Sequence, residues 1–150
     1  MSNSEYKKWK KALQGFWFEH YIEKILLELK EEGIIQSVFS SVTKEAKKDK
    51  QDFEVDLIVY SNFTLRCISV TTIDNDEEAK FKLYEVKARA YQLCGDVNKV
   101  AYVNLCPNNE KLLEEYRGVW ENKLDDVLII SHDKLKGCKE LIKNWVSKES

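Results

Sequence analysis

The sequence predicts a single mixed α/β domain in which helices flank a sheet. Helical periodicity dominates residues 5–32, three β-type runs follow, and shorter helical and β-type segments then alternate to the end. A length of 150 residues suits one domain, residues 1–150. Five Gly and one Pro argue against a loop-rich β-sandwich, and a hydrophobic content of 43% excludes a disordered tail.

The first predicted element is a long helix over residues 5–32, followed by Gly33 as a C-terminal stop signal. Gly15 is the awkward residue, because a Gly inside a helix costs about 1 kcal/mol relative to Ala. It marks either a close packing contact or a break between two helices. We expect the aromatic side chains of this helix to be core rather than a base-stacking platform: Trp9, Phe16, Trp17 and Tyr21.

Three β-type runs come next, rich in Val, Ile, Phe, Tyr and Thr. The charged segment 44–52 separates the first two as a solvated loop, and Ser61-Asn62 predicts a tight hairpin turn between the last two. Asp56 falls near the middle of the second run on a half-apolar face, which is an unusual position for an aspartate. The runs cover residues 34–43, 53–60 and 65–72.

Helices and strands alternate in the second half of the chain. Acidic residues in the segment 74–78 suit the positive N-terminal end of a helix that ends near Cys94. The remaining segments predict a strand at 99–105, a helix at 109–117, a short buried strand at 127–130 and a closing helix at 134–146. The predicted order is therefore α-β-β-β-α-β-α-β-α.

Charge and cysteine content narrow the function classes. The 24 Lys+Arg and 26 Asp+Glu give a net charge of -2, which excludes nucleic-acid binding through overall positive charge but allows a local basic groove. The four Cys form no C-x-x-C pair and the two His lie far apart in sequence, so zinc-finger spacing is absent. Without an apolar run of spanning length or a signal-peptide pattern, we expect a cytoplasmic protein with reduced thiols and no membrane partner.

Several short motifs occur in order between residues 15 and 104. They are G-F-W-F-E at 15–19, F-E-V-D-L at 53–57, C-I-S-V-T at 67–71, L-Y-E at 83–85, C-G-D at 94–96 and the strand 99–103. The ordered set resembles the PD-(D/E)XK nuclease superfamily. Within that superfamily it is similar to the nuclease domain of CARF-linked effectors of type III CRISPR systems.

This resemblance implies a restriction-endonuclease-like core, α-β-β-β-α-β, with an additional α-β-α at the C-terminus. In that superfamily carboxylates hold Mg²⁺ or Mn²⁺ for phosphodiester hydrolysis, assisted by a lysine. Glu19 and Asp56 match metal-site carboxylates, and Glu85 matches a carboxylate that could serve when the strand acid is absent. Ser69 stands where the strand acid is expected, and Thr71 stands where the lysine is expected.

The two replaced groups define the leading hypothesis. Loss of one well-placed electrostatic group typically costs on the order of 10²–10³ in rate. We therefore expect a nuclease-derived, defence-associated domain that is weakly active or inactive and binds DNA or RNA. Lys82 shares a helix face with Glu85, so a rescued site of Glu19, Asp56, Glu85 and Lys82 is one possibility. The resemblance also implies a homodimer.

The alternative is a non-catalytic binding or dimerisation module, or a partner subunit in a defence system. An unrelated α/β domain with chance motif matches is a third reading. Each candidate residue also has a structural explanation: Glu19 as the edge of an amphipathic helix, Asp56 as a buried hydrogen-bond acceptor, Glu85 with Lys82 as a solvated helix face, and Ser69 with Thr71 as ordinary strand residues.

Overall fold

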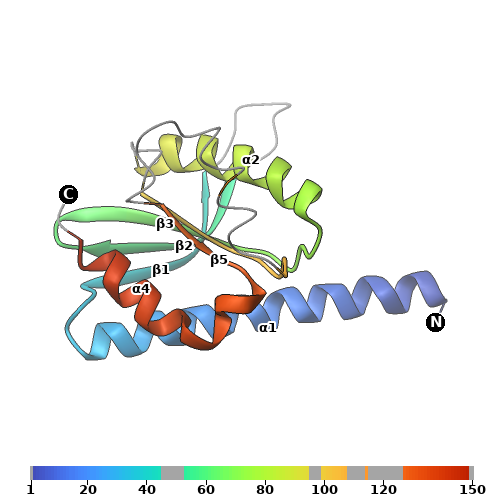
Figure 1. Cartoon of the computed structure of the whole chain (residues 1–150), viewed down its shortest axis with the longest axis horizontal. Coiled ribbons are helices and arrows are strands. Elements are labelled where there is room, and N and C mark those ends of the chain that lie inside the picture. The colour runs from blue at the N-terminus through green and yellow to red at the C-terminus, as the bar shows by residue number, and fades with distance from the viewer. Residues whose placement is uncertain (1, 45–52, 95–98, 108–113, 115–126, 149–150) are drawn as a thin grey trace.

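The fold has three layers, with helices on both faces of one sheet (Figure 1). The structure is a computed structural model that describes residues 2–44, 53–94, 99–107, 114 and 127–148. Within these ranges the side chains at 8–14, 41–44, 53–56, 76, 90 and 93–94 are not described. Helix α2 covers one face of the sheet, and α1 and α4 cover the other (Figure 1).

Five strands form a mixed sheet in the order β1-β2-β3-β4-β5. The pairs β1–β2 and β2–β3 are antiparallel, whereas β4 lies parallel to both β3 and β5. The predicted mixed sheet flanked by helices is confirmed. The strands are β1 (Ser37–Lys44), β2 (Phe53–Ser61), β3 (Thr64–Val70), β4 (Val100–Val103) and β5 (Leu128–Ile130).

The described helices follow the predicted order, with one difference near the C-terminus. There a 3-10 helix, η2, precedes the last α-helix, where the sequence predicts one continuous helix over 134–146. The predicted loop 44–52 and helix 109–117 fall largely outside the described residues. Within the described part of the chain, no helix is both long and apolar enough to cross a lipid bilayer. The helices are α1 (Asn3–Glu31), α2 (Asp76–Cys94), η2 (His132–Gly137) and α4 (Cys138–Val146).

Helix α1 is continuous through Gly15. It begins in a capping box in which the Ser2 hydroxyl accepts from the Glu5 backbone N–H, and the Glu5 carboxylate accepts from the Ser2 N–H. A Cβ at Gly15 would find no heavy atom within 4 Å. Both explanations proposed for Gly15, a helix break and a close contact, are therefore wrong. Gly33 follows the helix with φ +80°, which confirms it as the stop signal.

The larger core layer lies between the sheet and the pair α1 and α4. Lys139 of α4 bridges Glu28 and Glu32 near the end of α1, with N···O distances of 3.2 Å to each. Apolar side chains from both helices and from alternate positions of the strands fill this layer, among them Ile22, Leu26, Leu29, Leu57, Val59, Ile68, Ile142 and Trp145.

The second layer lies between the sheet and α2. Tyr102 of β4 is fully buried, and its hydroxyl donates to the Ala79 carbonyl of α2 at 3.4 Å. Ser69 pairs with Tyr102 across β3 and β4. Because successive strand residues point to opposite faces, Ser69 belongs to the α2 side and Ile68 to the α1 side.

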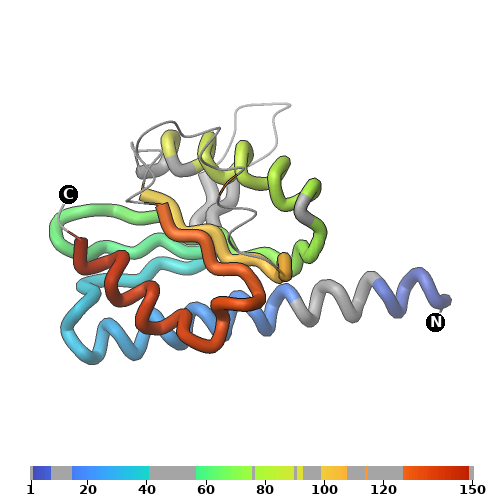
Figure 2. The backbone as a smooth tube through the Cα atoms, in the orientation of Figure 1, coloured from blue at the N-terminus to red at the C-terminus, as the bar shows by residue number. Residues whose placement is uncertain are grey.

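The β2–β3 hairpin turns at Asn62-Phe63, where φ is +48° and +60° as in a type I′ turn. The predicted turn, Ser61-Asn62, is one residue too early, because Ser61 pairs with Thr64. The buried Ser61 hydroxyl donates to the Val146 carbonyl at 3.0 Å, which holds Ser61 within the strand. The end of α4 accordingly lies beside this hairpin (Figure 2).

The cysteines differ in oxidation state. Cys67 in β3 is disulfide-bonded, whereas Cys106 and Cys138 are free and buried. The expectation of reduced thiols is therefore wrong for Cys67. Sequence spacing does not show which thiols meet in the fold, so the absence of a C-x-x-C pair carries no information on this bond.

Candidate functional site

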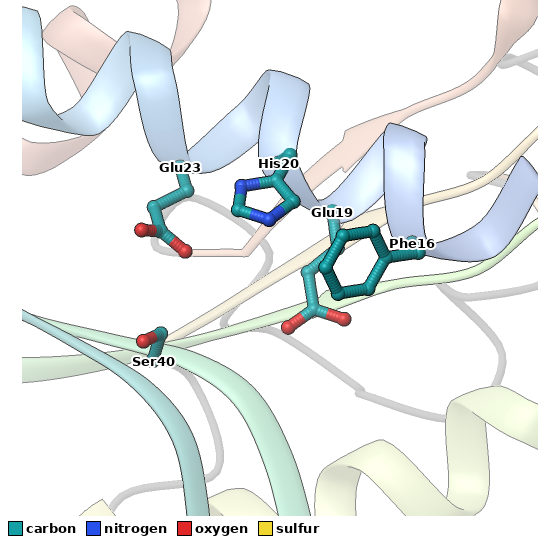
Figure 3. Close-up of a pocket in the computed structure, with 5 residues that line it drawn as sticks. All are labelled: Phe16, Glu19, His20, Glu23 and Ser40. Carbon is teal, nitrogen blue, oxygen red and sulfur yellow. The ribbon is translucent and has the colours of Figure 1, made fainter. Parts of the chain in front are cut away.

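A pocket of about 190 Å³ lies between α1 and the edge strand β1 (Figure 3). Two carboxylates from α1, Glu19 and Glu23, point from the helix toward the strands, where Ser40 lies (Figure 3). Their spacing of four residues places them one helical turn apart on the same flank. The pocket is lined by Phe16, Glu19, His20, Glu23 and Ser40.

The position of the pocket-lining side chains follows from which face of α1 is buried against the sheet. Phe18 and Ile22 face the core, so Glu19 and Glu23 lie at the edge of the buried face and are half-buried. The rings of Phe16 and His20 pack edge to face with centroids 4.5 Å apart. The pocket therefore combines an acidic floor with an aromatic wall.

Carboxylates are the ligands that Mg²⁺ and Mn²⁺ prefer, so the pocket offers suitable donor atoms. Among the side chains that the structure describes, however, no group of three or more His, Cys, Asp or Glu is arranged to hold a metal ion. Two carboxylates from one helix do not by themselves fit a metal centre. The backbone of Asp56 lies in β2, but its side chain lies outside the described residues, so its pairing with Glu19 stays a prediction.

Glu85 lies on α2, on the other side of the sheet from the helix that carries Glu19 (Figure 1). Lys82 Nζ lies 3.2 Å from a Glu85 carboxylate oxygen, and Arg89 pairs with the other oxygen. The shared helix face expected for Lys82 and Glu85 is therefore present as an ion pair. The side chain of Glu85 is 47% exposed, and neither residue lines the α1–β1 pocket.

Ser69 is buried against α2, and Thr71 makes local backbone hydrogen bonds. Ser69 is only 7% exposed and lies on the sheet face that α2 covers. Thr71, just beyond β3, donates its backbone N–H to the Val103 carbonyl at 2.9 Å. Its hydroxyl accepts from the Ile73 N–H at 3.3 Å. Neither residue lines the pocket.

Sequence reasoning missed Glu23 and Ser40. Glu23 could have been found, because it follows Glu19 by one helical turn. Ser40 carries no sequence signal, since its place beside the pocket depends on the pairing of β1 with β2, where it lies opposite Leu57.

The exposed aromatic side chains of α1 contradict the prediction that they belong to the core. Phe16 is 65% exposed, Trp17 is 66% exposed and Tyr21 is 39% exposed, so the prediction that they are core is wrong. Among the described side chains of α1, Phe18 is the first in the buried core, and these three rings lie outside that core. The side chain of Trp9 lies outside the described residues.

Where α1 meets α4, a tyrosine and a buried thiol interact. Burial raises the pKa of the Cys138 thiol above its ordinary value. The pKa of Tyr21 is also raised, first by the charge of the Cys138 thiolate and then by burial. Trp17 stacks on Tyr21 with ring centroids 5.7 Å apart.

Comparison with known proteins gives structural relatives. No family model and no curated protein matches the sequence. Protein VC1899 from Vibrio cholerae is similar at a TM-score of 0.69 and 18% identity, over 88% of this chain and 34% of that one. Can2 from Sulfobacillus thermosulfidooxidans, solved in complex with cyclic tetra-adenylate, is similar at a TM-score of 0.65 and 17% identity, over 89% of this chain and 36% of that one.

This chain shares a fold with both proteins. It spans about a third of the length of either relative. At these identities the likeness concerns the fold alone, and the fold it supports is the mixed five-stranded sheet with helices on both faces.

Proposed function

We propose that this chain is a nuclease-derived, defence-associated domain of restriction-endonuclease-like topology that binds nucleic acid and cleaves it weakly or not at all. Two observations support the defence association. The ordered motifs between residues 15 and 104 resemble the nuclease domain of CARF-linked effectors. The chain also shares its fold with Can2, which was solved with cyclic tetra-adenylate.

The proposal of weak or lost activity rests on the side chains of Ser69 and Thr71 and on their contacts. Ser69 is buried on the α2 side of the sheet, and the Thr71 hydroxyl accepts a local backbone hydrogen bond. A hydroxyl supplies neither the negative charge that holds a divalent cation nor the positive charge that stabilises a phosphorane-like transition state. With both charges absent, a rate loss on the order of 10⁴ or more follows if the two losses combine.

In the described part of the structure, Glu19 and Glu85 do not replace the charges that are absent at positions 69 and 71. Glu85 is engaged by Lys82 and Arg89 on α2, and Glu19 shares its pocket with Glu23 on α1. Weak Mg²⁺ or Mn²⁺ binding that involves Glu19 and Asp56 stays a prediction.

A second candidate function is a non-catalytic dimerisation module or partner subunit. The exposed rings of α1 favour it, since Phe16 and Trp17 each leave about two thirds of their surface in solvent. Figure 1 shows the N-terminal part of this helix extending beyond the sheet. In this alternative the helix surface serves a protein partner, and nucleic-acid binding is absent.

Restoring the missing charges tests the proposal. We expect the wild type to bind labelled single-stranded and duplex oligonucleotides with little cleavage in Mn²⁺, and Ser69→Glu with Thr71→Lys to gain Mn²⁺-dependent cleavage. The matched control is Ser69→Glu with Thr72→Lys, which adds the same charges but places the lysine one residue out of register. A folded Ser69→Glu, Thr71→Lys variant that stays silent contradicts descent from a nuclease site.

Because Ser69 is buried, the restored variant can fail to fold. A second test then uses calorimetric titration of the wild type with Mn²⁺ and Mg²⁺, with Asp56→Ala as control. Weak binding that disappears in Asp56→Ala supports a decayed metal site. Binding that is unchanged by Asp56→Ala contradicts it.

A further inference from the structure

Helix α2 carries a line of exposed aromatic side chains that the proposed function does not use. Phe81 is 72% exposed, Tyr84 is 48% exposed and Tyr91 is 64% exposed. With the exposed Ala88, their spacings of three, four and three residues place all four on one face of the helix. We call Phe81, Tyr84, Ala88 and Tyr91 the α2 stripe.

The α2 stripe faces away from the core. Ala79, Leu83 and Val86 are the α2 side chains that pack toward the sheet, and each is at most 4% exposed. An aromatic side chain buries about 150–250 Å² when it is covered, so three rings left in solvent on one face indicate a binding surface.

The charge around the α2 stripe indicates what kind of partner fits. Residues 79–94 contain Lys80, Lys82, Lys87 and Arg89 against a single acid, Glu85. The other acids of the helix lie at 76–78, where they suit the positive end of the helix dipole. The rings therefore lie in a locally positive stretch of a chain whose net charge is -2. A polyanion fits this surface better than a basic or neutral protein does.

A positive surface that interleaves exposed rings with basic side chains has the chemistry of a stacking platform. Every base has a π-face, so unstacked bases can lie on aromatic rings while Lys and Arg contact the phosphates. A duplex keeps its bases stacked on one another and cannot use the rings in this way. The stripe from Phe81 to Tyr91 is roughly 15 Å long, at about 1.5 Å rise per helical residue, which is enough for a few nucleotides.

We propose that the α2 stripe is a stacking platform for single-stranded nucleic acid, an inference that rests on the proposed nucleic-acid-binding function. Phe81, Tyr84 and Tyr91 stack against bases, and Lys80 and Lys87, seven residues apart beside one edge of the stripe, follow the phosphates. Ala88 leaves space between the rings for a base. The platform lies on the opposite side of the sheet from the Glu19 pocket (Figure 1).

Fluorescence anisotropy with a labelled oligothymidylate tests the platform. We expect Phe81→Ala and Tyr91→Ala each to weaken binding by roughly 5- to 150-fold, because stacking on one ring is worth about 1–3 kcal/mol per base. The slope of log K against log[salt] should not change in these variants. Lys87→Gln should instead reduce the slope by about 0.7, the single-strand value for one phosphate contact. Tyr6→Ala, a 59% exposed ring on α1, is the matched control and should bind as the wild type does.

The outcomes separate this proposal from the function on which it rests. Wild-type binding that Phe81→Ala and Tyr91→Ala leave unchanged overturns the platform but keeps nucleic-acid binding. No wild-type binding overturns both. Tighter binding of a duplex than of the single strand also overturns the platform. So does a wild-type dimer that the double variant Phe81→Ala, Tyr91→Ala converts to a monomer, and that result assigns the surface to a second copy of the chain.

Discussion

Gly15 and Gly33 differ in backbone conformation, although both have room for a Cβ. Gly15 lies inside α1 with open space where its Cβ would be. Gly33 also has open space, but its φ of +80° is one that residues with a Cβ rarely adopt. Conformation, rather than packing, therefore decides what each position tolerates.

We expect Gly15→Ala to stabilise the fold by about 0.5–1 kcal/mol, the usual gain of Ala over Gly inside a helix. Gly33→Ala should destabilise it by about 1–2 kcal/mol, since a Cβ is strained in the left-handed region. Urea denaturation of the two variants measures both values. A destabilised Gly15→Ala variant contradicts the open space beside the helix.

The contact between Cys138 and Tyr21 makes stability depend on alkaline pH. Burial raises the pKa of the folded-state thiol, so the folded protein resists deprotonation more than the unfolded chain does. The stabilising contribution is complete below the unfolded-state pKa, near 8.5 for a thiol, and is lost as pH rises toward the folded value. Tyr21, whose pKa is also raised, adds a loss of the same sign at higher pH.

We therefore expect Cys138→Ser to flatten the fall in the free energy of unfolding above about pH 8.5, because serine does not titrate there. Tyr21→Phe should remove part of the remaining fall. Denaturant unfolding at several pH values measures these differences against the wild type. Equal slopes for wild type and Cys138→Ser would contradict the assigned burial.

At the scale of elements, α1 shows where helical periodicity is informative and where it misleads. Repeating apolar residues predicted the helix and its end correctly. The same pattern wrongly assigned Phe16, Trp17 and Tyr21 to the core, because aromatic residues occur on more than one face of α1. Helical spacing alone cannot show which part of the helix packs against the sheet. Figure 1 shows that α1 extends beyond the edge of the sheet.

Two adjacent leucines test the packed face of α1. Leu26 is fully buried, whereas Leu27 is 45% exposed. Leu26→Ala should cost about 2–5 kcal/mol through lost burial and a residual cavity. Leu27→Ala, with the same chemistry and the same helix propensity change, should stay within about 0.5 kcal/mol of the wild type. Thermal and urea unfolding compare the two, and equal costs would place the packed face elsewhere.

Across the whole molecule, periodicity and turn residues predicted the mixed sheet and most element positions. The strand pairing and the crossover through α2 give the sheet its order, and these depend on contacts between segments far apart in sequence. Two predictions differ from the structure. The hairpin turn lies at Asn62-Phe63, one residue later than predicted, and Ser61 instead bonds to the Val146 carbonyl of α4. Cys67 forms a disulfide that its sequence spacing does not predict.

The candidate site was predicted less completely than the fold. Spacing correctly joined Lys82 to Glu85, a pair within one helix. It could not show that Glu19 would share a pocket with Ser40 of β1, while Glu85 lies on the other side of the sheet. Local pairs follow from the helical repeat, whereas a site built from several elements needs the tertiary arrangement.

The most direct test of binding without efficient cleavage records both in one sample. A labelled single strand is held with excess protein, anisotropy reports binding, and a denaturing gel of the same sample reports cleavage, in Mn²⁺ and in EDTA. We predict the same rise in anisotropy under both conditions and a strand that stays essentially full-length. Rapid Mn²⁺-dependent cleavage that Glu19→Gln abolishes, or no rise in anisotropy at all, would contradict the account.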